Sequence, residues 1–78
     1  MNKTRRQELQ TAIDLLEEAK SIIESAMSDE QSGFDNLTEG LQATARGQAM
    51  ESAIDYMDDA ISSIDDAIEN IDNAQYAG

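Results

Sequence analysis

The sequence predicts an all-α fold, an antiparallel two-helix hairpin, and three observations predict it. Apolar residues recur in heptads along two long segments, and no proline interrupts either segment. Glycine is confined to positions 33, 40, 47 and 78. The linker is too short to hold the helices apart. We therefore expect a single domain, 1–78, with a helix at 4–31, a linker at 32–45 and a helix at 46–75.

In the first helix, heptad position a holds a large aliphatic residue and position d holds alanine. Position a contains Leu9, Leu16 and Ile23, and position d contains Ala12, Ala19 and Ala26. Ile13 and Met27 lie at position e with Lys20 between them, and Leu15 and Ile22 lie at position g. Gly33 is expected to end this helix, because glycine is common just after a helix C-terminus.

The second helix repeats the same scheme. Position a contains Met50, Met57, Ile64 and Ile71, and position d contains Ala53, Ala60, Ala67 and Ala74. Thr44 is expected to cap its N-terminus. Alanine at each d position allows two backbones to approach closely. We therefore expect the two alanine columns to face each other, with positions a, e and g beside them.

The apolar stripe is wider than one partner helix can cover, and two helices make a small core. We expect self-association, in which two hairpins form a four-helix bundle or a higher homo-oligomer. The expected oligomer interface is the pair of apolar columns on the second helix, Ile54, Met57, Ile61, Ile64, Ile68 and Ile71. The alternative is a monomer in which Phe34, Leu37 and Leu41 of the linker fold over the open side.

Composition excludes several classes of function. The chain has no Cys and no His, which excludes disulfides, zinc sites and Ser-His-Asp catalysis. We expect no enzyme activity, no cofactor and no metal. A net charge of −12 argues against direct nucleic-acid binding, and no apolar run approaches the roughly 20 residues of a membrane span. The basic start lacks the apolar segment of a signal peptide, so we expect a cytoplasmic protein.

The acidic residues are concentrated in the second helix. Residues 48–78 hold eight acids and no base, at heptad positions b, c and f: Glu51, Asp55, Asp58, Asp59, Asp65, Asp66, Glu69 and Asp72. These acids form a row about 31 Å long on the side of the helix opposite its apolar stripe. One interpretation is a solvated face that keeps the hairpin soluble. The other is a surface for a basic partner, with partial mimicry of DNA. Solubility alone does not explain why the row has one sign, since mixed charges at i,i+4 stabilise helices.

A second candidate site lies where the linker meets the second helix. Free N–H groups and the helix dipole at such a terminus attract anions. The residues concerned are Gln42, Thr44, Arg46 and Gly47, and the expected ligand is a nucleotide-like signalling molecule. The alternative for Arg46 is a salt bridge or plain solvation.

Four runs of sequence carry a resemblance: Met1–Arg6, Asp35–Gln42, Arg46–Glu51 and the Ala-Ile-Asp heptads that follow. With these runs the chain resembles small acidic helical-hairpin accessory proteins of bacteriophages and prophages of Gram-positive bacteria. Thr38 stands where relatives are expected to have proline. The group has no settled function. The resemblance implies a phage accessory protein in the host bacterial cytoplasm, and small acidic phage proteins often act against host defences.

Three functions follow from these features. The first is a non-enzymatic inhibitor that binds a basic host protein through the acidic row, a nucleic-acid-handling defence factor, in the manner of an anti-CRISPR protein or DNA mimic. The second is an oligomeric sponge that sequesters a nucleotide-like molecule at the linker. The third is a structural or assembly protein whose acids only keep it soluble.

Overall fold

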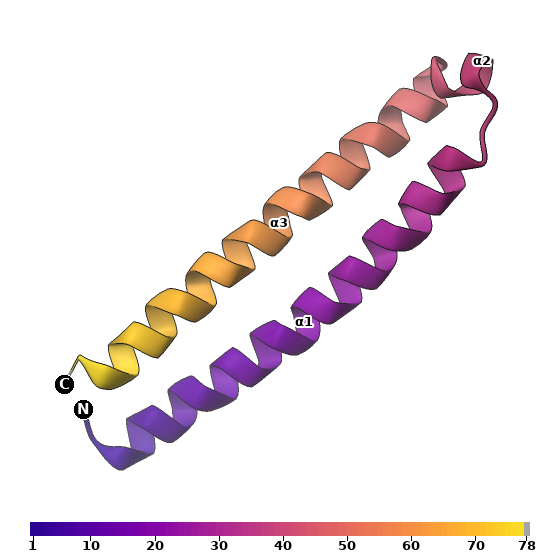
Figure 1. Ribbon diagram of the computed structural model, residues 1–78. Helices are drawn as coiled ribbons and strands as arrows, with labels where there is room; N and C mark the ends of the chain where they lie inside the picture. Colours follow the sequence, from indigo (N-terminus) through magenta and orange to yellow (C-terminus); the bar gives the residue numbers. More distant parts are fainter. Residues whose placement is uncertain (78) are drawn as a thin grey trace.

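The computed structural model describes residues 1–77, which form three helices. They are α1 (Lys3–Asp35), α2 (Glu39–Gln42) and α3 (Ala45–Tyr76). Helices α1 and α3 lie antiparallel and side by side, with both chain termini at one end and α2 at the other (Figure 1). The predicted all-α helical hairpin is confirmed.

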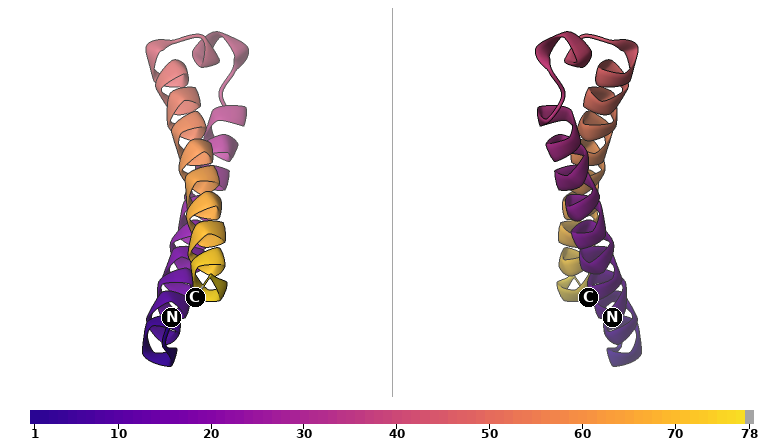
Figure 2. Two further views of the ribbon diagram at one scale, coloured as in Figure 1. Left: turned by 90° about the vertical axis from the view of Figure 1, so that its left-hand side faces the viewer. Right: turned by 90° about the vertical axis from the view of Figure 1, so that its right-hand side faces the viewer.

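The hairpin is a thin rod. Its extents are 58 × 16 × 12 Å and its radius of gyration is 17.5 Å, whereas a compact domain of this length has a radius of gyration of about 11.5 Å. The side views show α1 and α3 crossing at a shallow angle (Figure 2). With one helix on each side of a single interface, the core is a narrow seam rather than a globular interior.

Helix α1 is longer than the sequence predicts at both ends. Asn2 caps its N-terminus, where the side-chain oxygen accepts a hydrogen bond from the Arg5 amide at 2.8 Å. At the other end α1 continues to Asp35, so the expected stop at Gly33 is wrong. Gly33 has no positive φ; instead, the Met50 methyl carbon lies 3.1 Å from where a Cβ would stand. This glycine therefore makes room for a side chain of the opposite helix.

The seam is centred on position a, not on the alanine column. Positions d, a and e follow one another around a helix, and from Leu9 to Phe34 and from Gly47 to Gln75 they are buried or half-buried, except Ala26, which is exposed. Ile13, at position e, is 5% exposed, whereas Leu15 and Ile22, at position g, are 61% and 65% exposed. The expected arrangement, with position g beside the seam, is therefore wrong. Position e carries large apolar residues on both helices, so turning the seam toward e covers more apolar surface.

The linker is a tight corner built around Gln42. Its side-chain amide donates hydrogen bonds to the carbonyl oxygens of Phe34 and Leu37, at 3.2 and 3.3 Å. Gly47 is buried, and a Cβ there would overlap the backbone of Gln42, standing 2.7 Å from its Cα. Helix α2 therefore rests directly on the first turn of α3. The predicted cap at Thr44 is confirmed, since its hydroxyl oxygen accepts a hydrogen bond from the Gly47 amide at 3.4 Å.

Replacing Gly47 by alanine should open this corner. The added methyl group has no room against the Gln42 backbone, and such overpacking costs about 1–3 kcal/mol in the free energy of unfolding. We expect a melting temperature lower by roughly 4–8 °C per kcal/mol, measured by circular dichroism at fixed protein concentration. Gly40→Ala is the control, because nothing lies within 4 Å of its added Cβ, and it should not lower the melting temperature. Equal melting temperatures for the two variants would show that the corner is not closely packed.

Candidate functional site

The eight acids predicted from the heptads all lie exposed on α3. We call this row the acidic face: Glu51, Asp55, Asp58, Asp59, Asp65, Asp66, Glu69 and Asp72. Seven of the eight form no ion pair within residues 1–77. Helix α3 also contains no base after Arg46, at its start. The face therefore presents its negative charge to solvent along a rigid support.

Asp65 is the exception, because it meets Lys20 of α1. The Lys20 ammonium lies 2.7 Å from a carboxylate oxygen of Asp65. The hydrogen bond from Lys20 to Asp65 raises the pKa of the lysine above its ordinary value, with smaller contributions from the charges of Asp65, Glu24 and Glu17. Sequence reasoning missed this pair. The signal was available, since Lys20 interrupts an apolar column at position e and Asp65 lies at the adjacent position b.

The linker residues are occupied mainly in building the corner. The Gln42 amide donates to two carbonyls, and the Thr44 hydroxyl accepts from Gly47 and donates to the Leu41 carbonyl. Gly47 is buried against Gln42. Arg46 is exposed and forms no ion pair among the residues that the structure describes. Of the four predicted linker residues, only Arg46 presents its side chain to solvent without an assigned contact.

The end with the chain termini is held by a polar clamp that the sequence did not reveal. The Arg6 guanidinium donates from Nε to the Gln75 carbonyl at 3.0 Å. The side-chain amide of Gln75 donates to the Gln10 side-chain oxygen at 3.2 Å. Gln75 is 8% exposed, so these bonds satisfy a buried polar residue. The clamp ties the last turn of α3 to the first turns of α1.

The six residues expected at an oligomer interface lie in the seam. Ile54, Met57, Ile61, Ile64, Ile68 and Ile71 are all half-buried against α1, and none is exposed. The large apolar or aromatic side chains exposed along the middle of the rod are Leu15 and Ile22 of α1 and Tyr56 of α3. Leu15 and Ile22 lie at position g, next to the alanine column of α1.

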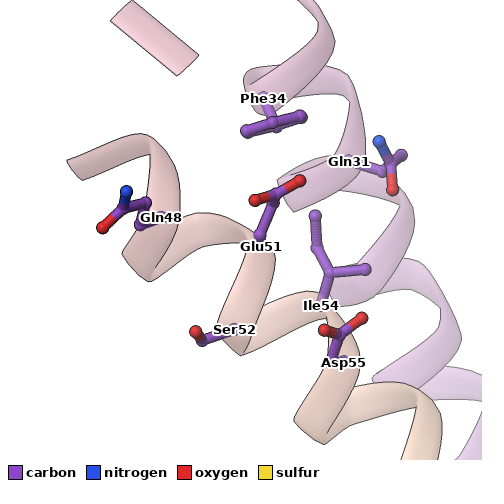
Figure 3. A pocket seen from close by; sticks show the side chains of 7 residues that line it. All are labelled: Gln31, Phe34, Gln48, Glu51, Ser52, Ile54 and Asp55. Atoms are coloured by element: carbon purple, nitrogen blue, oxygen red, sulfur yellow. The ribbon is translucent and has the colours of Figure 1, made fainter. Parts of the chain in front are cut away.

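Near the linker, the opposite edge of the seam is hollowed. Two adjoining hollows of about 440 and 450 Å³ share Gln31, Ile54 and Asp55. We call them together the end groove; its lining is Met27, Ser28, Gln31, Ser32 and Phe34 of α1 with Gln48, Glu51, Ser52, Ile54, Asp55 and Asp58 of α3. Figure 3 shows Glu51 rising from α3 toward the Phe34 ring, with Ile54 beside it. Three members of the acidic face thus border an apolar floor.

The described residues hold no group of three or more side chains placed to bind a metal ion. Within residues 1–77, neither long helix is apolar enough to cross a membrane. No protein-family model, curated protein or solved structure matches the chain.

The Lys20–Asp65 pair should make stability depend on pH in the alkaline range. A lysine whose pKa is raised on folding stabilises the fold fully below its unfolded pKa, about 10.4, and this contribution is lost as pH rises through the folded pKa. We expect the difference in urea stability between the protein and Lys20→Gln to stay constant up to about pH 9 and to shrink toward pH 12. Lys3→Gln is the control, because Lys3 forms no ion pair within residues 1–77. A difference for Lys20→Gln that does not change with pH would contradict the role of the pair.

Proposed function

We propose that this protein is a non-enzymatic inhibitor that binds a basic surface of another protein through its acidic face. The observation that carries the proposal is the row of exposed acids on α3, of which Asp65 alone has an ion-pair partner in residues 1–77. Like charges at i,i+3 and i,i+4 destabilise a helix by a few tenths of a kcal/mol each. A basic partner would relieve that repulsion. The electrostatic field of the acidic face would also steer the partner toward it.

The partner we propose is a host protein that handles nucleic acid, and the resemblance to phage accessory proteins suggests a defence factor. Basic surfaces that bind nucleic acid are shaped for rows of negative charge. The acidic face carries eight charges over about 31 Å, or one per about 4 Å, compared with one per about 1.7 Å of duplex DNA. The imitation is partial, as expected for an anti-CRISPR or DNA-mimic protein that blocks a channel without matching a full duplex.

A nucleotide-binding sponge has less support from the linker. The polar groups of Gln42 and Thr44 already take part in hydrogen bonds within the corner, and Gly47 is buried. An anion would be left with the exposed Arg46 in a chain of net charge −12. The carboxylates of the acidic face, by contrast, form no ion pair within residues 1–77 except at Asp65.

Self-association belongs to the same proposal. Leu15 and Ile22 are more than half exposed beside the alanine column of α1, and most of the seam is only half-buried. A second hairpin laid along this edge would cover them and form a four-helix bundle. One face of the rod measures 58 × 16 Å, and its area is close to the roughly 800 Å² that each partner buries in a stable interface. The contact would therefore need to extend along the whole length of the rod.

Removing charge from the acidic face should abolish partner binding. In the variant Asp58→Asn, Asp59→Asn, Asp66→Asn and Asp72→Asn, Asp65 is kept so that its pair with Lys20 remains. The protein immobilised on beads should retain basic proteins from a bacterial lysate that are released by salt and by competing duplex DNA, and the variant should not retain them.

The control changes four exposed acids of α1 and alters the net charge equally: Glu8→Gln, Glu17→Gln, Glu18→Gln and Glu24→Gln. We expect it to retain the same proteins as the unchanged chain. Equal loss in both variants would indicate a non-specific charge effect, and retention by the α3 variant would overturn the role of the acidic face.

Leu15→Ser with Ile22→Ser should weaken self-association. Both residues are more than 60% exposed in the hairpin, so the change removes apolar surface from the outer edge and leaves the seam intact. Sedimentation at about 0.5 M salt, where the repulsion between copies of charge −12 is screened, should show a smaller species for the variant. Tyr76→Ser, at an exposed residue at the end of α3, serves as the control. An unchanged sedimentation coefficient would place the interface elsewhere.

A further inference from the structure

The end groove joins an apolar floor to an acidic wall. Met27, Phe34 and Ile54 are half-buried and form the floor. The wall contributed by α3 holds Glu51, Asp55 and Asp58, whereas the part of the lining contributed by α1 carries no charge. Each of the two hollows falls in the range of about 300–1,000 Å³ that is usual for small binding sites.

No basic side chain among the residues that the structure describes pairs with this wall. Glu51, Asp55 and Asp58 form no ion pair within residues 1–77. Gln31, on the opposite side, directs its amide to Asp35 at 2.9 Å rather than to these carboxylates. The spacings i,i+4 and i,i+3 along α3 place the three acids as neighbours on the helix surface. A cation entering from outside would meet several carboxylates together.

We propose that the end groove receives an arginine side chain of the basic partner, an inference that rests on the proposed function and locates its central contact. The aliphatic stem of arginine suits the floor of Met27 and Ile54, because long basic side chains bury their stems and keep their charge near water. The guanidinium plane stacks on an aromatic face such as Phe34. Its fork of N–H donors matches carboxylates in paired geometry, which the single ammonium of lysine does not.

The position of the groove fits this occupant better than a second copy. The groove opens on the edge bordered by position e, and Leu15 and Ile22 lie on the other edge, beside position d. A second hairpin covering those two residues would leave the end groove open. The groove is also continuous with the rest of the acidic face, so a basic partner lying along α3 would reach it.

The test is an NMR titration of the full-length protein, labelled at the Ile and Met methyl groups, with a blocked tetra-arginine peptide. We expect the methyl signals of Ile54 and Met27 to shift, and tetra-lysine of equal charge to bind at least about 5-fold more weakly. Equal affinity of the two peptides, or shifts confined to methyl groups far from the groove, would overturn the assignment to arginine in this groove.

Matched variants separate the groove from the face as a whole. Glu51→Gln with Asp55→Asn should weaken tetra-arginine binding about 10-fold, whereas Glu69→Gln with Asp72→Asn, the same charge change outside the groove, should weaken it less than 2-fold. Equal weakening by the two variants would overturn the assignment of arginine binding to the groove and leave the proposed function standing. Absence of peptide binding, with basic proteins still captured from lysate, would overturn the groove alone. Groove signals that shift with protein concentration before peptide is added would show that a second copy occupies it, which also overturns the proposal.

Discussion

The packing of positions d, a and e of α1 against those of α3 is the constraint on which the rest of the structure depends. In a rod 16 Å wide there is one long interface, and a residue's role follows from its place around that interface. Residues on it, Lys20 included, are buried or half-buried. The acidic face begins beside it at position b of α3, where Asp65 pairs with Lys20 and Glu51 borders the end groove, and continues onto the exposed side of the helix. Because the seam covers most side chains only in part, the fold also depends on how its two ends are closed.

The two ends supply what the repeated heptads lack, a single register. Sliding one helix past the other by seven residues would keep the apolar matches in the middle of the rod, since large aliphatic residues and alanine recur at that spacing. Lys20 would not resist such a slip, because position b of α3 is acidic in each heptad and would offer Asp58 or Asp72 instead. The ends do resist it. Gln42 packs against Gly47 of α3 and bonds to the Phe34 carbonyl at the end of α1, and Gln75 replaces the isoleucine of its column and bonds to Gln10.

The sequence alone predicts the parts of this fold that depend on local periodicity. The two helices, their antiparallel pairing and the cap at Thr44 follow from heptads and capping chemistry, and so does the exposure of the acidic face. The role of Gly33 depends on Met50, a residue that is distant in sequence, so local pattern does not predict it. The regular spacing of alanine does not locate the centre of the seam either, because the buried area depends on the larger side chains at position e. The end groove forms only where the end of α1 lies beside the beginning of α3, so the sequence of neither helix alone predicts it.

The two proposed associations would respond to salt in opposite ways. Each copy carries a net charge of −12, so pairing of hairpins would bring like charges together, and salt would favour it by screening. The proposed binding to a basic surface would depend on the same charges, and salt would weaken it. The apolar edge at Leu15 and Ile22 and the acidic wall of the end groove lie on different sides of the seam, so the two proposed contacts would not compete for surface. A basic partner would lower the repulsion within α3 and between copies, and by linkage it would stabilise both the hairpin and its assembly.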